Sequence, residues 1–239
     1  MERSNTGEPE MSAAAEARAP ADDARATHLG FVAHEIRNPL STALWTAEML
    51  ARMTLEERGG QRGEKLSGMC LRSIARVRQL VEDHFMCERL DMGGLPLRPE
   101  SVGAGEALDA ALGRHPAELV SAHVDPALGV EVDRGLLERA LEALVAVAGA
   151  ERTPVVVSAH ATEREVSFHV AGKHADASAV ADPVKGSPSD PTGRALAVPL
   201  ARRVAAALGG TLLVTEGAWL LTLPRSRAYT PRPVPAAHP

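Results

Sequence analysis

Aromatic side chains are scarce in this sequence of 239 residues, because Phe, Trp and Tyr together make up only 3% of it. The hydrophobic cores must therefore be built mainly from Ala, Leu and Val. Cysteine is also rare: Cys70 and Cys87 are too few for a disulfide framework, and they suit a reducing cytosol. Hydrophobic residues at 45% and charged residues at 24% are ordinary for a globular chain and exclude wholesale disorder.

Three further absences restrict the class of protein. The chain has no uninterrupted apolar run of about 18 residues, which argues against a membrane span. Its first twenty residues contain no apolar stretch of the kind that a signal peptide requires. The net charge of −5 argues against a nucleic-acid binder that depends on phosphate contacts. We therefore expect a cytoplasmic protein that binds no nucleic acid, and the length favours two modest domains.

The chain divides into four segments by composition. Residues 1–25 mix Ala, Glu, Ser and Pro without periodicity and are predicted to form a disordered tail. Residues 26–93 contain two amphipathic helical patterns. Residues 100–224 alternate between patterns typical of helices and of strands, and residues 225–239 form a second, Pro-rich disordered tail.

Two helical stripes separated by glycines predict a helical hairpin in residues 26–93. Apolar positions follow one another at spacings of three and four residues, which is a heptad-like pattern. Because two helices leave much apolar surface in water, we predict that a second copy completes a four-helix bundle. Packing of the hairpin on its own C-terminal domain is the alternative. The positions are Leu29, Val32, Ile36, Leu40, Ala43, Ala47 and Leu50, then glycines 59, 60 and 63, then Leu66, Cys70, Val77, Leu80 or Val81, and Phe85.

The C-terminal half has patterns typical of an α+β fold, in which helices cover one face of a mixed sheet. The strongest helix pattern spans residues 133–148, and Gly209-Gly210 stops another helix. A loop rich in Pro, Ser, Gly and Asp separates these two helices. The predicted helices are 102–112, 133–148 and 193–208, the strands are 118–124, 155–157, 166–170, 211–214 and 219–223, and the loop is 182–192.

The segment 31–40, FVAHEIRNPL, carries the chemistry of the first helix. On a helix, His34 points roughly 200° away from the apolar stripe, so it should face water. Asn38 lies one turn later on the same face, and Glu35 is the sequence neighbour. Pro39 cannot donate a backbone hydrogen bond, which leaves the Glu35 carbonyl without its usual helical partner. An exposed imidazole flanked by a carboxylate and an amide is suited to act as a nucleophile with an orienting group beside it.

These ten residues resemble the H-box of the histidine kinase family of two-component signalling, in which Phe and a short spacer precede His-Glu-(Leu/Ile)-Arg-(Asn/Thr)-Pro-Leu. Residues 74–83 and 89–93 are similar to the second hairpin helix of that family and to its exit. The resemblance implies that His34 is the phosphoacceptor and that the hairpin is the dimerisation domain. It also implies that residues 100–224 form a histidine-kinase-like ATPase domain, as in dimeric histidine phosphotransferases whose ATPase domain is degenerate.

The resemblance weakens at the positions with which family kinases bind ATP. Ala143 and Val147 stand where the family has two asparagines, one of which holds Mg²⁺. Residues 170–174 keep one glycine of the next box and lack the aspartate that reads adenine, and residues 191–196 keep one glycine of the last. Apolar side chains cannot ligate Mg²⁺, and an unpaired adenine amine costs roughly 1–3 kcal/mol. We therefore expect no intrinsic cofactor and no useful ATP binding, with Mg²⁺ supplied by the partner.

The leading hypothesis is a histidine phosphotransferase that moves phosphoryl groups between a receiver-domain aspartate and His34 without ATP. Its partner would be a response-regulator receiver domain, and Glu35 would orient or deprotonate the imidazole. A second hypothesis is hydrolysis of the receiver's phospho-aspartate, because residues 35–38 fit the family's phosphatase motif and Asn38 could hold the attacking water. A sensor kinase with an atypical ATP site and a non-catalytic pseudokinase scaffold remain as alternatives.

A few other residues invite a functional interpretation. Trp45 lies about 16 Å along the helix from the phosphoacceptor position and nearly on the same face. It is either displayed to a receiver or packed against the second helix. His84 is predicted to pack within the bundle. The histidines at 160, 169 and 174 have no ligand-like spacing, so no metal site is predicted.

Overall fold

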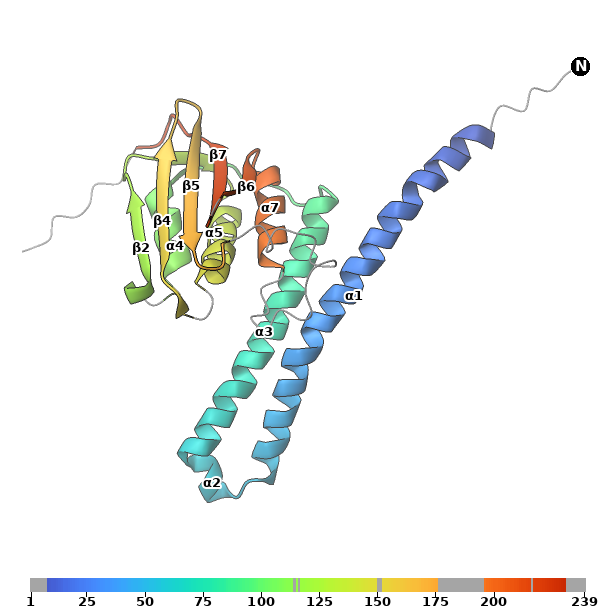
Figure 1. The fold of residues 1–239 in the computed structure, drawn as a ribbon, viewed down its shortest axis with the longest axis vertical. Helices are drawn as coiled ribbons and strands as arrows, with labels where there is room; N and C mark the ends of the chain where they lie inside the picture. The colour runs from blue at the N-terminus through green and yellow to red at the C-terminus, as the bar shows by residue number, and fades with distance from the viewer. Residues whose placement is uncertain are drawn as a thin grey trace, which may run out of the picture. The chain divides into compact units, whose positions relative to one another are not determined.

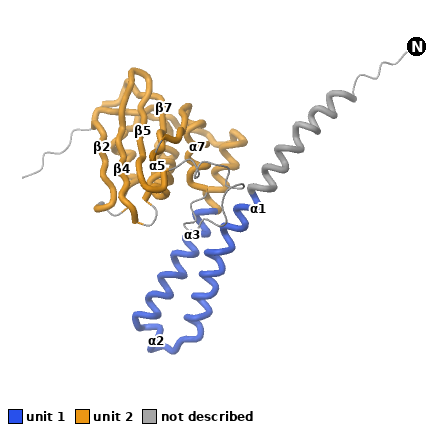
Figure 2. The backbone as a smooth tube through the Cα atoms, viewed as in Figure 1, with its two compact units in different colours: residues 1–80 blue, residues 81–239 orange. Residues whose placement is uncertain are grey.

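The computed structural model describes residues 8–113, 115, 117–149, 152–175, 196–215 and 217–230, with only the backbone for residues 8–28 and 117. The chain divides into two compact units, residues 1–80 and residues 81–239 (Figure 2). The first unit is helical, and the second combines helices with a sheet. The predicted α+β class is thereby confirmed.

The first unit is a helical hairpin. Helix α1 spans Glu8–Arg52, the short helix α2 spans Leu55–Gly59, and helix α3 spans Gln61–Asp91 and continues into the second unit (Figure 1). A capping box starts α2: the Thr54 hydroxyl accepts from the Glu57 backbone N–H at 3.3 Å, and the Glu57 carboxylate accepts from the Thr54 N–H at 2.8 Å. Local hydrogen bonds therefore fix where the chain reverses.

The start of the first helix differs from the sequence prediction. Residues 8–25 were assigned to a disordered tail, but the backbone of α1 is helical from Glu8 onward. This segment is rich in Ala and Glu, whose helix propensity is high even where no apolar periodicity marks a buried face. The same helix ends at Arg52, two residues after the last predicted apolar position, Leu50, because the Thr54 cap begins a new helix.

Gly63 allows α2 and α3 to meet closely. It lies inside α3, so only Gly59 and Gly60 sit at the break that the sequence indicated. A Cβ atom built on Gly63 would lie 2.1 Å from the backbone oxygen of Arg58, a separation that real side chains do not adopt. No residue other than glycine fits this turn without a shift of the backbone.

The hairpin buries one face of each helix and leaves another apolar face exposed. Cys70 joins the two helices through a contact of 3.5 Å between its Sγ and the Ala43 carbonyl. The prediction of a single apolar stripe was therefore too simple, because the residues of that stripe divide between the two faces. Buried residues are Val32, Ala43, Met53, Leu66 and Leu80, whereas Leu29, Leu40, Ala47 and Phe85, which the prediction placed in the stripe, are exposed.

The second unit is a five-stranded mixed sheet covered on one face by helices (Figure 1). The strand order is β2-β4-β5-β7-β6, in which β2 and β4 are parallel and the other neighbours are antiparallel. The strands are β2 Val120–Val124, β4 Val155–Ala161, β5 Glu165–Gly172, β6 Thr211–Thr215 and β7 Ala218–Pro224, and the helices are α4 Ala104–Leu112, α5 Arg134–Ala148 and α7 Ala197–Ala207, with a 3-10 turn at Ala117–Leu119.

Alternating burial along the strands builds the core of this unit. Every second residue of β5 and β7 is buried, and Phe168 and Trp219 are the largest of these side chains. They pack with leucines, valines and alanines of the three helices. The core is therefore made largely of aliphatic residues, as the composition predicted.

A second, two-stranded sheet was missed by the sequence analysis. Strand β1, Glu100–Gly103, pairs with β3, Gly129–Val132. The helix predicted for residues 102–112 therefore begins at Ala104 in the structure, two residues later than predicted. Four-residue strands carry too little periodicity to be recognised alone. The predicted loop 182–192 lies outside the described residues.

The segment that follows β7 packs on this small sheet. Residues 225–239 were predicted to be disordered, but Ser226 is buried and its backbone N–H donates to the Gly129 carbonyl at 2.9 Å. Its hydroxyl also bonds the Ser101 hydroxyl at 2.7 Å. The prediction is therefore wrong for residues 225–230, and residues 231–239 lie outside the described part.

The last turns of α3 are built into the second unit. Cys87 is only 1% exposed and belongs to its hydrophobic core. Asp83 forms a largely buried ion pair with Arg139 of α5. Asp91 accepts two hydrogen bonds from Nε of Arg203 in α7, at 2.8 and 2.9 Å. Residues 81–91 are thus attached to both helices by charge as well as by packing.

Candidate functional site

His34 lies on the exposed face of α1. Val32 and Ile36, two residues before and after it, are buried and half-buried respectively. Asn38 is exposed one turn later, so the two side chains leave the helix in similar directions. The prediction that His34 faces water is confirmed, and an imidazole in this position is accessible to a macromolecular partner.

Glu35 lies on the opposite side of the helix from water, with only 4% of its surface exposed. Consecutive helical residues point about 100° apart, so the carboxylate leaves α1 on the buried face while the neighbouring imidazole leaves it on the exposed face. The sequence reasoning placed Glu35 beside His34 but missed this burial. The available signal was its spacing: Glu35 follows Val32 by three residues and precedes Pro39 by four.

The helix backbone around the site is continuous through Pro39. Thr42 donates its hydroxyl to the Asn38 carbonyl at 3.1 Å, and the fully buried Thr46 donates to the Thr42 and Ala43 carbonyls at 2.8 and 2.9 Å. These bonds within one helix satisfy both hydroxyl donors. The site therefore rests on a regular helix and not on a loop.

Trp45 lies further along α1, and 53% of its surface is exposed. This exposure decides between the two interpretations that the sequence left open, because an indole packed against α3 would be buried. A large aromatic side chain in water about three turns from His34 is a candidate anchor for a binding partner.

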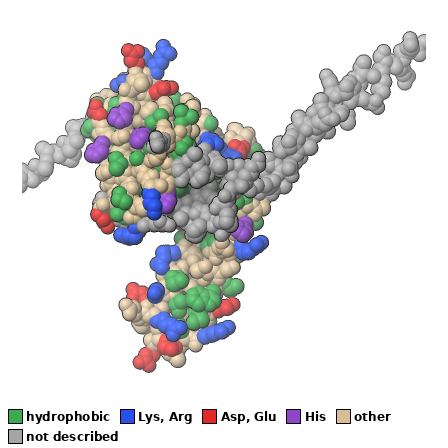
Figure 3. Space-filling model, viewed as in Figure 1, with side chains coloured by type: hydrophobic (Ala, Val, Ile, Leu, Met, Phe, Trp, Pro, Cys, Tyr) green, Lys and Arg blue, Asp and Glu red, His purple; other side chains and the backbone are tan. Residues whose placement is uncertain are grey.

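A separate apolar surface lies on the hairpin. Figure 3 shows hydrophobic side chains gathered on the hairpin between charged ones. Large apolar residues of both helices are more than half exposed. We call these residues the apolar face of the hairpin: Leu40, Leu44, Leu71 and Ile74.

The positions that correspond to ATP-binding residues of family kinases offer little to a nucleotide. Ala143 and Val147 occupy half-buried positions on α5, and their methyl and isopropyl groups supply no oxygen to Mg²⁺. At the end of β5, a Cβ on Gly172 would lie 2.8 Å from the Ala148 carbonyl, so strand and helix are in close contact there. Ala143 and Val147 therefore cannot ligate Mg²⁺. Residues 176–195, which include most of the last family box, lie outside the described part.

The described residues contain neither a metal-binding cluster nor a helix that could span a membrane. Among the described residues, no group of three or more His, Cys, Asp and Glu side chains is arranged to hold a metal ion. His84 instead stacks at a tilt on Phe85, with ring centroids 5.8 Å apart. Within the same described ranges, no helix combines the length and the apolar character needed to cross a membrane.

Comparison with known proteins gives a family match for the hairpin and a similar fold for most of the chain. Residues 24–93 match the His Kinase A (phospho-acceptor) domain, a span that contains His34, Glu35 and Asn38. The histidine kinase AdeS of Acinetobacter baumannii has a similar fold, with a TM-score of 0.59, 16% identity, and coverage of 82% of this chain and 98% of AdeS. No curated protein sequence matches the chain.

Two other solved structures share this fold. Histidine kinase ThkA in complex with response regulator protein TrrA matches with a TM-score of 0.59 and 14% identity, over 93% of this chain and 68% of that one. Full-length ShkA in complex with AMPPNP matches with a TM-score of 0.56 and 21% identity, over 86% of this chain. The chain spans about half the length of ShkA, because the match covers 47% of that protein.

Proposed function

We propose that this chain is a histidine phosphotransferase of the histidine kinase family of two-component signalling, and that it acts between response-regulator receivers. In this function His34 takes a phosphoryl group from a receiver aspartate and passes it to another receiver. The observation that carries the proposal is the combination of an exposed His34 with apolar side chains at Ala143 and Val147, where family kinases hold Mg-ATP.

The proposed chemistry needs no nucleotide. One imidazole nitrogen of His34 attacks the phosphorus of the aspartyl phosphate, the bond from phosphorus to the carboxylate oxygen breaks, and the imidazole N–H proton passes to solvent. An acyl phosphate and a phosphohistidine are both reactive phosphoryl donors, so the reaction can run in either direction. The receiver supplies its own Mg²⁺, which neutralises charge on the transferring group.

The surroundings of His34 support docking of a protein. The imidazole lies on the exposed side of a regular helix, and the exposed Trp45 lies further along the same helix. Glu35 lies on the buried face of the helix. We therefore propose that its carboxylate stabilises the local hairpin structure and contributes to the electric field at the imidazole. ThkA, which shares the fold, has been solved with its response regulator TrrA. On the basis of this shared fold, we propose that a receiver domain is also the partner of this chain.

Labelled phosphate distinguishes the proposal from an ordinary kinase. The full chain is incubated in separate reactions with γ-labelled ATP and with a receiver domain phosphorylated by acetyl phosphate. We expect label on the protein only from the receiver, and none on a His34→Gln variant. The matched control His160→Gln changes an exposed histidine of the second unit and should label like the parent. Label on His34 from ATP would overturn the assignment in favour of a kinase.

Hydrolysis of the receiver's phospho-aspartate is the second candidate, and the exposure of Asn38 one turn from His34 favours it. An amide on this face can hold a water molecule in line with the phosphorus of a docked receiver. The two activities separate by mutation: Asn38→Ala should leave labelling of His34 intact while it lowers release of free phosphate at least tenfold. If Asn38→Ala releases phosphate as fast as the parent, the hydrolytic candidate fails.

A further inference from the structure

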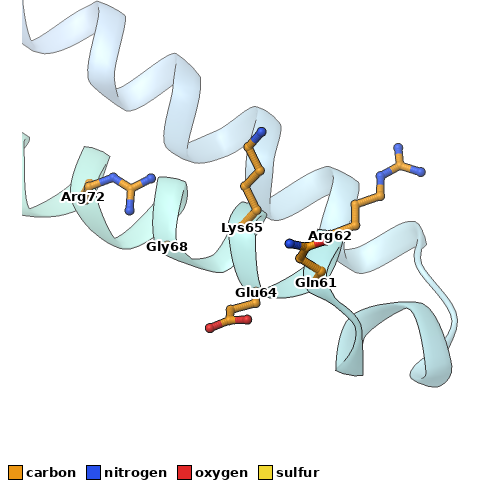
Figure 4. Close-up of a pocket in the computed structure, with 6 residues that line it drawn as sticks. All are labelled: Gln61, Arg62, Glu64, Lys65, Gly68 and Arg72. Atoms are coloured by element: carbon orange, nitrogen blue, oxygen red, sulfur yellow. The ribbon is translucent and has the colours of Figure 1, made fainter.

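The first three turns of α3 carry a surface hollow with an excess of positive charge. Its volume is about 720 Å³, which lies in the range of small-molecule binding sites. Three of its lining side chains are cationic and one is anionic. The lining residues, drawn in Figure 4, are Gln61, Arg62, Glu64, Lys65, Gly68 and Arg72. We call this site the basic hollow.

The basic hollow lies on a different face of α3 from the apolar residues. Its members Lys65, Gly68 and Arg72 follow one another at spacings of three and four residues, which places them on one side of the helix. Leu71 and Ile74 lie about 120° away around the same helix. A partner that covers the apolar face would therefore leave the basic hollow open.

Two of the three cations of the basic hollow, Lys65 and Arg72, are not neutralised by a described side chain, whereas Arg62 lies near the Glu57 carboxylate. Among the described residues, Lys65 and Arg72 take part in no ion pair or side-chain hydrogen bond. Figure 4 shows the Lys65 and Glu64 side chains leaving the helix in opposite directions, so the carboxylate does not compensate the ammonium group. The start of a helix also carries partial positive charge, which makes cations there unfavourable in the absence of an anion.

Glycine at position 68 shapes the floor of the basic hollow. A Cβ atom there would lie 3.1 Å from Nη1 of Arg72, closer than most real contacts. The absence of a side chain lets the guanidinium lie against the helix, and Figure 4 shows Arg72 extended toward Gly68. A planar, five-donor group held in this way is suited to bidentate binding of phosphate oxygens.

We propose that the basic hollow binds a small anion with two or more phosphate groups, such as pyrophosphate or the diphosphate of a nucleotide. Lys65 and Arg72 are seven residues apart, which corresponds to about 10 Å along the helix, so separated negative charges match them better than a single phosphate does. Lys65 supplies a point charge, Arg72 a bidentate fork, and Arg62 a third cation at the mouth. This site does not depend on the assignment of His34 as a phosphoacceptor.

Titration calorimetry of the full chain with pyrophosphate, and separately with ADP, tests the proposal. We expect Lys65→Ala combined with Arg72→Ala to weaken pyrophosphate binding at least tenfold. Gly68→Leu, which fills the floor without a change of charge, should weaken it at least fivefold. The matched control Arg52→Ala removes a cation from the last turn of α1, outside the lining, and should bind like the parent. Circular dichroism verifies that each variant keeps its helices.

Three outcomes would overturn the proposal. The first is that the parent does not bind pyrophosphate, or that the double variant binds it as tightly as the parent does. The second is an equal loss of affinity in Arg52→Ala, which would indicate a general charge effect. The third is a double variant that loses receiver binding but keeps pyrophosphate affinity, because the surface would then serve a protein partner. Tighter binding of ADP than of pyrophosphate, lost with the same residues, supports the proposal and identifies a nucleotide as the source of the diphosphate.

Discussion

At the scale of single residues, the polar side chains of the candidate site leave helix α1 in different directions. His34 and Asn38 leave α1 toward water, and Glu35 leaves it toward the interior of the hairpin. Heptad spacing predicted the exposure of the first two, because both lie away from the apolar stripe. The same spacing also placed Glu35 on the side of Val32, but a carboxylate is rarely buried, so its residue type argued against the position that the spacing indicated.

Cys87 provides a residue-scale prediction about pH. Burial, together with the carboxylates of Asp83, Asp91 and Glu88, raises the pKa of Cys87 to about 12, although Arg203 acts in the opposite direction. In the unfolded chain the thiol ionises near pH 9, whereas in the folded chain it stays protonated. The contribution of the neutral thiol to stability is therefore complete below pH 9 and is lost as the pH rises toward 12.

We expect the free energy of unfolding to fall between pH 9 and pH 11 by roughly 2–3 kcal/mol more in the parent than in Cys87→Ala. Urea denaturation of both proteins at several pH values measures this difference. Parallel curves for the two proteins would contradict the buried, protonated state of the thiol.

At the scale of elements, the sequence predicted the helix boundaries that local capping residues determine, and it missed the two short strands β1 and β3. The helix after Asp133 was foreseen, and in the structure the Asp133 carboxylate accepts from the Leu136 N–H as an N-cap. The stop at Gly209 was also foreseen, and this residue has φ of +75°. Strands β1 and β3 depend on pairing between distant segments, which no local pattern encodes.

Gly63 yields an element-scale prediction for the hairpin turn. Gly63→Ala should destabilise the protein by about 2 kcal/mol, because its Cβ would collide with the backbone of Arg58. Gly59 is the matched control: a Cβ there meets nothing within 4 Å, so Gly59→Ala should be neutral or slightly stabilising. Thermal unfolding followed by circular dichroism measures both. Equal stability of the two variants would show that the turn can relax.

The two ion pairs that hold the end of α3 should differ in strength. In the Asp83–Arg139 pair the side chains are 8% and 18% exposed, whereas in the Asp91–Arg203 pair they are 46% and 31% exposed. We expect Asp83→Ala to cost about 3 kcal/mol, because it leaves the largely buried Arg139 with only the more distant Glu142 carboxylate at 3.9 Å, and Asp91→Ala to cost about 0.5 kcal/mol. Chemical denaturation of the two variants ranks them. The reverse order would mean that geometry outweighs burial here.

At the scale of the whole molecule, the apolar face of the hairpin predicts a homodimer. Leu71 and Ile74 are 68% and 53% exposed in a single chain, and Leu40 and Leu44 are exposed on the other helix. A second copy that covers these side chains completes a four-helix bundle. We expect the parent to sediment as a dimer and Leu71→Glu combined with Ile74→Glu to sediment as a monomer. Val156→Glu, at an exposed valine of the sheet, is the control and should remain dimeric.

The two thiols offer a means of following each compact unit separately. Cys70 is half-buried in the hairpin and Cys87 is buried in the second unit, so each unit contains one free cysteine and neither is readily reached by an alkylating reagent. A thiol reacts only when its surroundings open. The rate at which a mass-tagged maleimide modifies Cys70 therefore measures local opening of the helical hairpin. The rate at Cys87 measures opening of the second unit, and both rates come from one unmutated protein.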